Sequence, residues 1–196
     1  MTTANKITIL RILLVPFFVV ELIYYLRSGN ELFRTAALLA FGLASVLDGV
    51  DGYIARHFNQ KSDLGAILDP LADKSLLVSG VVVLSLNHSN HRGQIPLWLI
   101  GTILGRDAVI LLGVGVVRYT VGTVVVRPRV LGKIATVLQM AVVIWVLLKL
   151  DSGSWGRWTG GLMLGAAVCT GISGLLYVWD GVRQLSAHPI SSSVKK

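Results

Sequence analysis

Residues Ala44 to Lys74 read A-S-V-L-D-G-V-D-G-Y-I-A-R-H-F-N-Q-K-S-D-L-G-A-I-L-D-P-L-A-D-K. Two apolar runs in this stretch are typical of membrane helices, yet they carry four aspartates: Asp48, Asp51, Asp69 and Asp73. An ionised carboxylate inside a membrane costs several kcal/mol unless it meets a cation or water, so intramembrane acids are functional candidates. The four carboxylates predict a metal site.

The spacing of the aspartates predicts how they could share one site. Residues three or four apart lie on the same face of a helix, so the first two aspartates share a face, and so do the last two. The polar segment 57–63 predicts a turn at the membrane surface that folds the second helix back on the first. Asp48 then lies roughly 13 Å from this turn and Asp73 roughly 12 Å, at about 1.5 Å per residue. Oxygen ligands at one depth suit Mg²⁺ or Mn²⁺.

Small residues beside the aspartates predict room for a ligand. Gly52 and Ala55 lie on the Asp48 face, and their lack of bulk leaves a slot where a planar ring or a phosphate could approach the backbone. Arg56, one turn nearer the surface, can bind a phosphate in bidentate fashion. Gly65 opens the second helix.

As a pattern, the stretch is D-x2-D-G-x2-A-R-x8-G-x3-D-x3-D. This pattern resembles the signature of the CDP-alcohol phosphotransferases, integral membrane enzymes that move a phosphatidyl group from CDP-diacylglycerol to an alcohol and release CMP. The run N-K-I-T-I-L-R-I-L-L-V-P from Asn5 to Pro16 resembles the opening of the glycerol-phosphate branch of that family. The run G-K-I-A-T-V-L-Q-M from Gly132 resembles its fifth helix, so the resemblance covers most of the chain.

The resemblance implies a role for each residue of the site. Two divalent ions would clamp the diphosphate, with Asp48 and Asp69 bridging both. Asp51 would complete the ligands of one ion, and Asp73 would complete those of the other. Asp73 is also the proposed general base of the family, although the spacing alone does not distinguish it from the other three aspartates. The candidate residues for binding the CDP-lipid are Asn5, Thr8, Gly52, Ala55, Arg56, Ser62 and Gly65.

Composition indicates a membrane protein, because 54% of the 196 residues are hydrophobic and only 14% are charged. We expect one membrane domain over residues 1–186 and a short polar tail over 187–196. The predicted fold is all-α, with six transmembrane helices of roughly 20 residues and a polar cavity that faces the cytoplasm. These helices are expected near Ile7–Leu26, Leu32–Arg56, Leu64–Leu86, Ile95–Tyr119, Leu131–Leu150 and Gly160–Val182. The first is expected to stay uncleaved, because no small-x-small site follows it.

Charge predicts the orientation in the membrane. Lysine and arginine are in excess at one set of helix ends, and this excess marks the cytoplasmic side of the cell (inner or plasma) membrane. Both termini and the acidic site then face the cytoplasm. The net charge of +8 also suits contact with anionic lipid head groups, although a topology signal accounts for it equally well. We do not expect nucleic-acid binding, because the cations are spread among membrane loops without a basic stripe.

Three basic residues of the later spans are candidates for binding the phosphate of the acceptor. Arg106 lies in the middle of the fourth predicted helix, Arg118 at its cytoplasmic end and Lys133 at the start of the fifth. Arg106 is costly there unless it is paired or solvated. An ion pair with an acid on another helix is the alternative for Arg106, and snorkelling to the surface is the alternative for the other two.

Two further sets of residues predict structure rather than chemistry. Tryptophans near the ends of the predicted spans indicate an interfacial aromatic belt: Trp98, Trp155, Trp158 and Trp179. Glycines in the sixth span predict close helix packing: Gly160, Gly161, Gly165, Gly171 and Gly174.

The acceptor and the class of protein leave alternatives. The N-terminal run and G-K-x-x-T-x-x-Q favour glycerol-3-phosphate as acceptor, whereas G-R-D-A-V-I-L-L from Gly105 resembles cardiolipin synthases of the same superfamily, which use phosphatidylglycerol. A cation transporter would also carry intramembrane aspartates, but it would not need the set Gly52, Ala55 and Arg56. A membrane prenyltransferase uses paired D-x3-D motifs with Mg²⁺, but it normally has more spans. The family resemblance also implies a homodimer.

Overall fold

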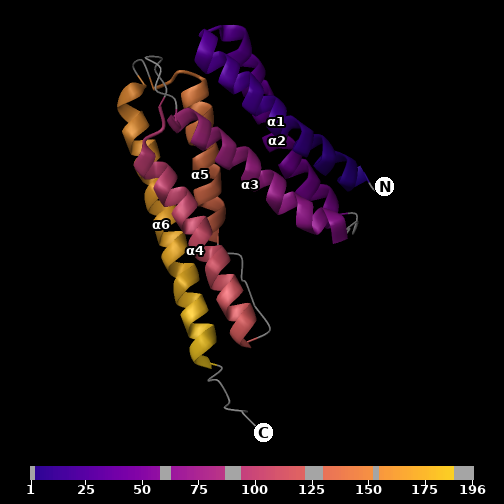
Figure 1. Cartoon of the computed structure of the whole chain (residues 1–196), viewed down its shortest axis with the longest axis vertical. Coiled ribbons are helices and arrows are strands. Elements are labelled where there is room, and N and C mark those ends of the chain that lie inside the picture. Colours follow the sequence, from indigo (N-terminus) through magenta and orange to yellow (C-terminus); the bar gives the residue numbers. More distant parts are fainter. Residues whose placement is uncertain (1–2, 58–62, 87–93, 122–129, 152–154, 188–196) are drawn as a thin grey trace. The chain divides into compact units, whose positions relative to one another are not determined.

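The computed structural model describes residues 3–57, 63–86, 94–121, 130–151 and 155–187. The side chains at 3–8, 51–57, 63–73, 118, 120–121 and 184–187 lie outside this description. The described residues form six helices and no strand (Figure 1). The helices are α1 (Thr3–Ser28), α2 (Glu31–His57), α3 (Asp63–Leu86), α4 (Leu97–Val121), α5 (Val130–Leu147) and α6 (Gly156–Ala187). The expected all-α architecture is confirmed.

Length and composition make the chain a multi-pass membrane protein. Within the described residues, five segments are long and apolar enough to cross a bilayer: Ile9–Ser28, Glu31–Val50, Leu97–Val117, Val130–Leu147 and Gly156–Arg183. In α3 the described side chains form a shorter apolar stretch, Lys74–Leu86. The four tryptophans expected in an interfacial belt are all exposed, as that position requires.

The chain divides into two compact units. The first unit is Met1–Ile95 with Met140–Thr159, and the second is Pro96–Gln139 with Gly160–Lys196. The division passes through α5 and α6, so each of these helices contributes residues to both units.

The first unit has an apolar core in which α1 packs against α2 and α3 (Figure 1). Phe18 of α1 and Phe41 of α2 are fully buried, and their ring centroids lie 5.2 Å apart. Gly80 of α3 faces the same core, because a Cβ there would lie 3.3 Å from the Phe18 ring and 3.4 Å from Val143 Cγ1. The missing side chain therefore lets α3 approach its neighbours closely.

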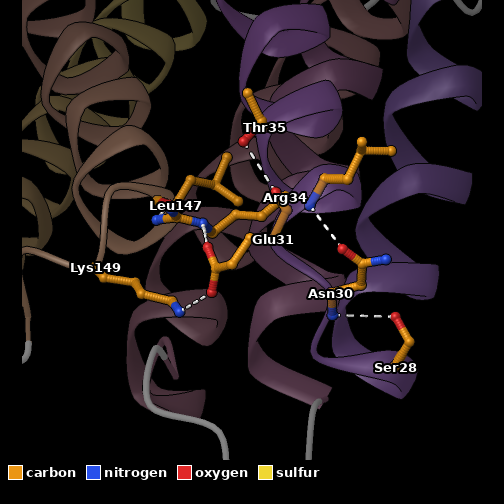
Figure 2. Close-up of polar contacts among 8 residues, drawn as sticks. Ser28, Asn30, Glu31, Arg34, Thr35, Leu147 and Lys149 are labelled. Atoms are coloured by element: carbon orange, nitrogen blue, oxygen red, sulfur yellow. Dashed lines mark hydrogen bonds and ion pairs between the residues drawn. The ribbon is translucent and has the colours of Figure 1, made fainter.

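A tight turn joins α1 to α2 at the end of the first unit opposite to the acidic ends of α2 and α3. Gly29 adopts a positive φ of 68° and donates its N–H to the Tyr25 carbonyl at 2.8 Å, which is an αL helix cap. Asn30 Oδ1 then accepts the Leu32 N–H at 3.0 Å and caps the start of α2. Figure 2 shows this turn with Ser28, whose Oγ accepts the Asn30 N–H at 3.2 Å. The sequence S-G-N thus ends one helix and begins the next.

Charged residues fasten the start of α2 to the end of α5 within the same unit (Figure 2). Glu31 forms ion pairs with Arg34, at 2.6 Å, and with Lys149. Arg34 Nη1 also donates to the Leu147 carbonyl at 3.0 Å. The hydrogen bond to Glu31 raises the pKa of the Lys149 ammonium. The side chains of Glu31 and Lys149 are about half exposed, so their ion pair adds little to stability and mainly fixes the contact.

The second unit contains a buried polar pair between α5 and α6. Gln139 Nε2 donates to Thr170 Oγ1 at 2.7 Å, and Thr170 Oγ1 donates to the Ala166 carbonyl at 2.6 Å. Both side chains are at least 95% buried, so each needs its partner. The packing expected of the α6 glycines is confirmed at Gly174 and stays a prediction at the other four. A Cβ at those four would meet nothing within 4 Å in the described part of the chain.

Candidate functional site

The acidic stretch occupies the end of α2 and the beginning of α3. Asp48 and Asp51 belong to α2, which ends at His57, whereas Asp69 and Asp73 belong to α3, which begins at Asp63. The two predicted helices are therefore confirmed, whereas the predicted turn between them falls on residues 58–62, outside the described part of the chain. The side chains of Asp51, Asp69 and Asp73 lie outside the described residues, so the meeting of all four carboxylates stays a prediction.

The side chain of Asp48 is described, and it contacts a residue of α1. Arg11 Nη1 donates to Asp48 Oδ1 in an ion pair between residues 37 positions apart. The Arg11 side chain is only 1% exposed, whereas that of Asp48 is 41% exposed. The carboxylate is thus held by α1 and still offers surface to a ligand.

Arg11 was not predicted as a site residue, although it lies in the run from Asn5 to Pro16 that carries the family resemblance. The signal was nevertheless available. Arg11 lies within the membrane segment Ile9–Ser28, and a charge at such a position is a functional candidate. Its partner could not be predicted without the packing of α1 on α2.

The candidate residues for the CDP-lipid lie at the same ends of the helices as the aspartates, by backbone position. Asn5 and Thr8 are in the first turns of α1, and Gly65 is in the first turn of α3. Gly52, Ala55 and Arg56 are in the last turns of α2. Ser62 and the side chains of the other candidates lie outside the described residues, so their contacts with a nucleotide lipid stay a prediction.

Arg106 is the best-defined of the candidate acceptor-binding residues. Its side chain is 12% exposed and lies in the second unit. Nη1 pairs with Asp107 Oδ1 at 2.8 Å, and Nη2 donates to Ser173 Oγ of α6 at 3.2 Å. Its guanidinium carbon lies 5.7 Å from the centre of the Tyr177 ring, within the range of a cation–π contact. Among the described residues, the acid that pairs with Arg106 is therefore its neighbour on α4 rather than an acid on another helix.

Two glycines make room for Arg106. A Cβ at Gly132 of α5 would lie 3.2 Å from Arg106 Nη2, and a Cβ at Gly174 of α6 would lie 3.2 Å from Arg106 Cγ. The side chain is thus confined by backbone on two helices. Arg106 Nε is buried and has no hydrogen-bond partner among the described residues. The bonds to Asp107 and Ser173 use only two of the five N–H groups of the guanidinium, which leaves donors for a ligand.

The other two candidates for the acceptor are less closely defined. Lys133 follows Gly132 in the first turn of α5 and is exposed. Arg118 lies in the last turn of α4, and its side chain is outside the described residues. The structure therefore brings the backbone next to Lys133 against Arg106, and the grouping of all three cations stays a prediction.

The chemistry of the acidic stretch fits a hard divalent cation. Asp48 presents a partly exposed carboxylate, and oxygen is the ligand that Mg²⁺ and Mn²⁺ prefer. Among the residues whose side chains are described, no three metal-binding groups cluster. The side chains of three of the four aspartates lie outside that set, so the quartet stays a prediction.

Comparison with known proteins adds a second, independent line of information. The sequence model of the CDP-alcohol phosphatidyltransferase family matches residues 1–172. A protein of Mycobacterium tuberculosis named "Probable phosphatidylglycerophosphate synthase" is 33% identical over 187 residues, which are 93% of this chain and 82% of that protein. An Escherichia coli protein named "CDP-diacylglycerol--glycerol-3-phosphate 3-phosphatidyltransferase" is 33% identical over 186 residues, which are 92% of this chain and 91% of that protein.

Proposed function

Because the chain belongs to the CDP-alcohol phosphatidyltransferase family, we propose that it transfers the phosphatidyl group of CDP-diacylglycerol to glycerol-3-phosphate and releases CMP. The observation that carries the choice of acceptor is the likeness to two relatives named for phosphatidylglycerophosphate synthesis, over more than nine-tenths of this chain. The aspartate pattern on α2 and α3 supports the shared chemistry. The product would be phosphatidylglycerophosphate, a precursor for membrane lipids.

Four carboxylates would hold the reacting diphosphate through two divalent cations, Mg²⁺ or Mn²⁺. In this proposal the ligands are Asp48, Asp51, Asp69 and Asp73. Metal ions bound there would polarise the phosphoryl group and neutralise the charge that develops as CMP leaves. Arg56, at the end of α2, would bind a phosphate group of the lipid and so hold it in position.

Asp73 would act as the general base. It would take the proton from the hydroxyl of the acceptor as the oxygen attacks the phosphorus that carries diacylglycerol. The bond from this phosphorus to the oxygen that bridges to CMP would break, and CMP would leave with that oxygen. A base must reach the attacking oxygen, and a carboxylate at the metal site has the chemistry to do so.

Arg106 would bind the phosphate of glycerol-3-phosphate. Asp107 and Ser173 each accept a hydrogen bond from one Nη atom and so fix the guanidinium, and its remaining N–H groups would donate to phosphate oxygens. Arg118 and Lys133 would add positive charge near the ends of α4 and α5. A phosphorylated acceptor, rather than a neutral alcohol, is the ligand that suits this charge.

The proposed setting is the cell membrane, with the active site open to the cytoplasm. The excess of basic residues at one set of helix ends supports this orientation. The acyl chains of CDP-diacylglycerol would stay in the bilayer while its head group reaches the aspartates. A homodimer, as the family resemblance implies, would place two such sites in one assembly.

Product analysis tests the proposed activity. Purified protein in detergent micelles would receive radiolabelled CDP-diacylglycerol, Mg²⁺ or Mn²⁺, and either glycerol-3-phosphate or phosphatidylglycerol. We expect phosphatidylglycerophosphate and CMP from glycerol-3-phosphate alone, and no product in EDTA. Formation of cardiolipin from phosphatidylglycerol would instead assign the chain to the cardiolipin synthases. No CMP under any condition would favour a cation transporter instead.

A second experiment tests the role of Arg106. Arg106→Gln removes the charge and the fork of donors, so we expect the Michaelis constant for glycerol-3-phosphate to rise at least tenfold, a loss of about 1.4 kcal/mol or more. The Michaelis constant for CDP-diacylglycerol should stay the same. Arg27→Gln, at the exposed end of α1, is the matched control. An unchanged constant for glycerol-3-phosphate in Arg106→Gln would move the acceptor site elsewhere.

A further inference from the structure

Arg11 is a buried charge in a membrane helix, and neither the sequence analysis nor the proposed mechanism assigns it a function. It lies in the segment Ile9–Ser28 and its side chain is 1% exposed. The guanidinium of an arginine is effectively always charged in proteins. A permanent charge at this depth is costly and is retained where it does a specific task.

The contact with Asp48 indicates that task. Arg11 Nη1 donates to Asp48 Oδ1 and so joins α1 to α2. A charge-assisted hydrogen bond from a rigid guanidinium fixes the direction of the carboxylate. The side chain of Asp48 is 41% exposed, and Arg11 is almost completely enclosed. The accessible part of the carboxylate therefore faces away from the arginine.

We propose that Arg11 is a positioning residue for the metal site, which orients Asp48 so that its accessible oxygen surface meets the cation. This inference rests on the proposed function, in which Asp48 is a metal ligand. Carboxylate ligands are commonly held by a second hydrogen bond of this kind, and loss of such a partner typically weakens metal binding about 10- to 100-fold. Arg11 thus acts on the metal through Asp48, without coordinating it.

The opposite role makes the opposite prediction. If Arg11 occupied the place of the cation, a metal ion would have to displace it, and removal of its charge would tighten metal binding. The enclosure of Arg11 argues against displacement, because the guanidinium would have to leave a site in which 99% of its side chain is covered. The change in metal affinity when the charge of Arg11 is removed therefore distinguishes the two roles: weaker binding indicates a positioning residue, and tighter binding indicates a residue that occupies the place of the cation.

Binding of Mn²⁺ to the full-length protein in detergent micelles, without lipid substrate, is the test. The electron paramagnetic resonance signal of free Mn²⁺ gives the dissociation constant without any catalytic step. We expect Arg11→Met to weaken binding by about tenfold or more, and Arg11→Lys to recover part of that loss because it restores the charge but not the planar fork. Arg27→Met removes one positive charge from the exposed end of the same helix and should bind Mn²⁺ as the unmodified protein does.

The pathway through Asp48 has its own test. Asp48→Asn should weaken Mn²⁺ binding, and adding Arg11→Met to it should cause little further loss, because the two residues act as a unit. Mn²⁺ binding by Arg11→Met that equals or exceeds that of the unmodified protein would overturn the inference. If Arg11→Met fails to fold, Arg11→Lys decides, since unchanged affinity in that variant would overturn it as well. Absence of Mn²⁺ binding in the unmodified protein would instead refute the proposed metal site.

Discussion

Gly174→Ala tests the packing of Arg106 between its neighbouring helices. A Cβ at Gly174 would lie 3.2 Å from Arg106 Cγ, 3.6 Å from its Cβ and 4.0 Å from its Cα. Carbon atoms in good contact lie about 3.5–4.0 Å apart. The closest of these atoms, Cγ, lies near the base of the arginine side chain, so relief requires a rotation about χ1 or a small shift of the α4 backbone.

The expected magnitude follows from two opposing effects. Overpacking of this kind costs about 1–3 kcal/mol, whereas alanine is favoured over glycine inside a helix by about 1 kcal/mol. Gly174→Ala should therefore lower the free energy of unfolding by about 0–2 kcal/mol. Gly171→Ala is the matched control one turn earlier, where a Cβ would meet nothing within 4 Å among the described residues. That variant should gain about 1 kcal/mol.

The difference between the two variants is the quantity to measure. Equilibrium unfolding in mixed micelles, followed by far-ultraviolet circular dichroism, would give both free energies under the same conditions. We expect Gly174→Ala to be less stable than Gly171→Ala by about 1–3 kcal/mol. Equal stability of the two variants would show that α4 and α6 are not held together at Arg106 as described.

Three further predictions concern single contacts. A Cβ in Gly132→Ala would lie 3.2 Å from Arg106 Nη2, 3.4 Å from Ser173 Oγ and 3.6 Å from the Tyr177 hydroxyl. The closest of these atoms is the far end of a flexible side chain, so stability should change by less than about 1 kcal/mol while the Michaelis constant for glycerol-3-phosphate rises. Thr170→Val leaves the buried Gln139 amide without its acceptor and should lower the free energy of unfolding by about 1–3 kcal/mol. Gln139→Leu should cost less, because Thr170 then keeps its hydrogen bond to the Ala166 carbonyl. Equal losses of stability in the two variants would contradict this. The raised pKa of Lys149 means that its ion pair stabilises the protein fully below about pH 10.5 and that this effect fades as the pH rises through the raised value. The small difference in melting temperature between Lys149→Met and the unmodified protein should therefore fade above that pH, and a difference that grows there would refute it.

Hydropathy predicted the positions of the helices but not their full lengths. The predicted bounds of α2 and α3 agree with the structure to within one residue at each end. Polar residues at 57–63 mark where α2 ends and where α3 begins. The sixth helix was expected over Gly160–Val182 and runs from Gly156 to Ala187. At about 1.5 Å per residue its 32 residues exceed the roughly 30 Å of a bilayer core, and hydropathy detects only the part inside that core.

The site was predictable where its residues are close in sequence. The aspartates could be identified from the sequence because their spacing places each pair on one helical face, and because a carboxylate in an apolar run is energetically costly. Arg11 and Asp48 are 37 positions apart, and Arg106 and Ser173 are 67 apart, so no local period connects them. Such partners depend on which helices pack together. The sequence alone therefore identified Arg106 as costly without finding the groups that hold it.

Anomalous diffraction from crystals grown with Mn²⁺ and CDP tests the central claim most directly. The account predicts two manganese peaks about 3.5–4 Å apart, enclosed by the carboxylates of Asp48, Asp51, Asp69 and Asp73. The diphosphate of CDP should lie against both peaks. Manganese bound elsewhere, with these four side chains turned away from one another, would contradict the account.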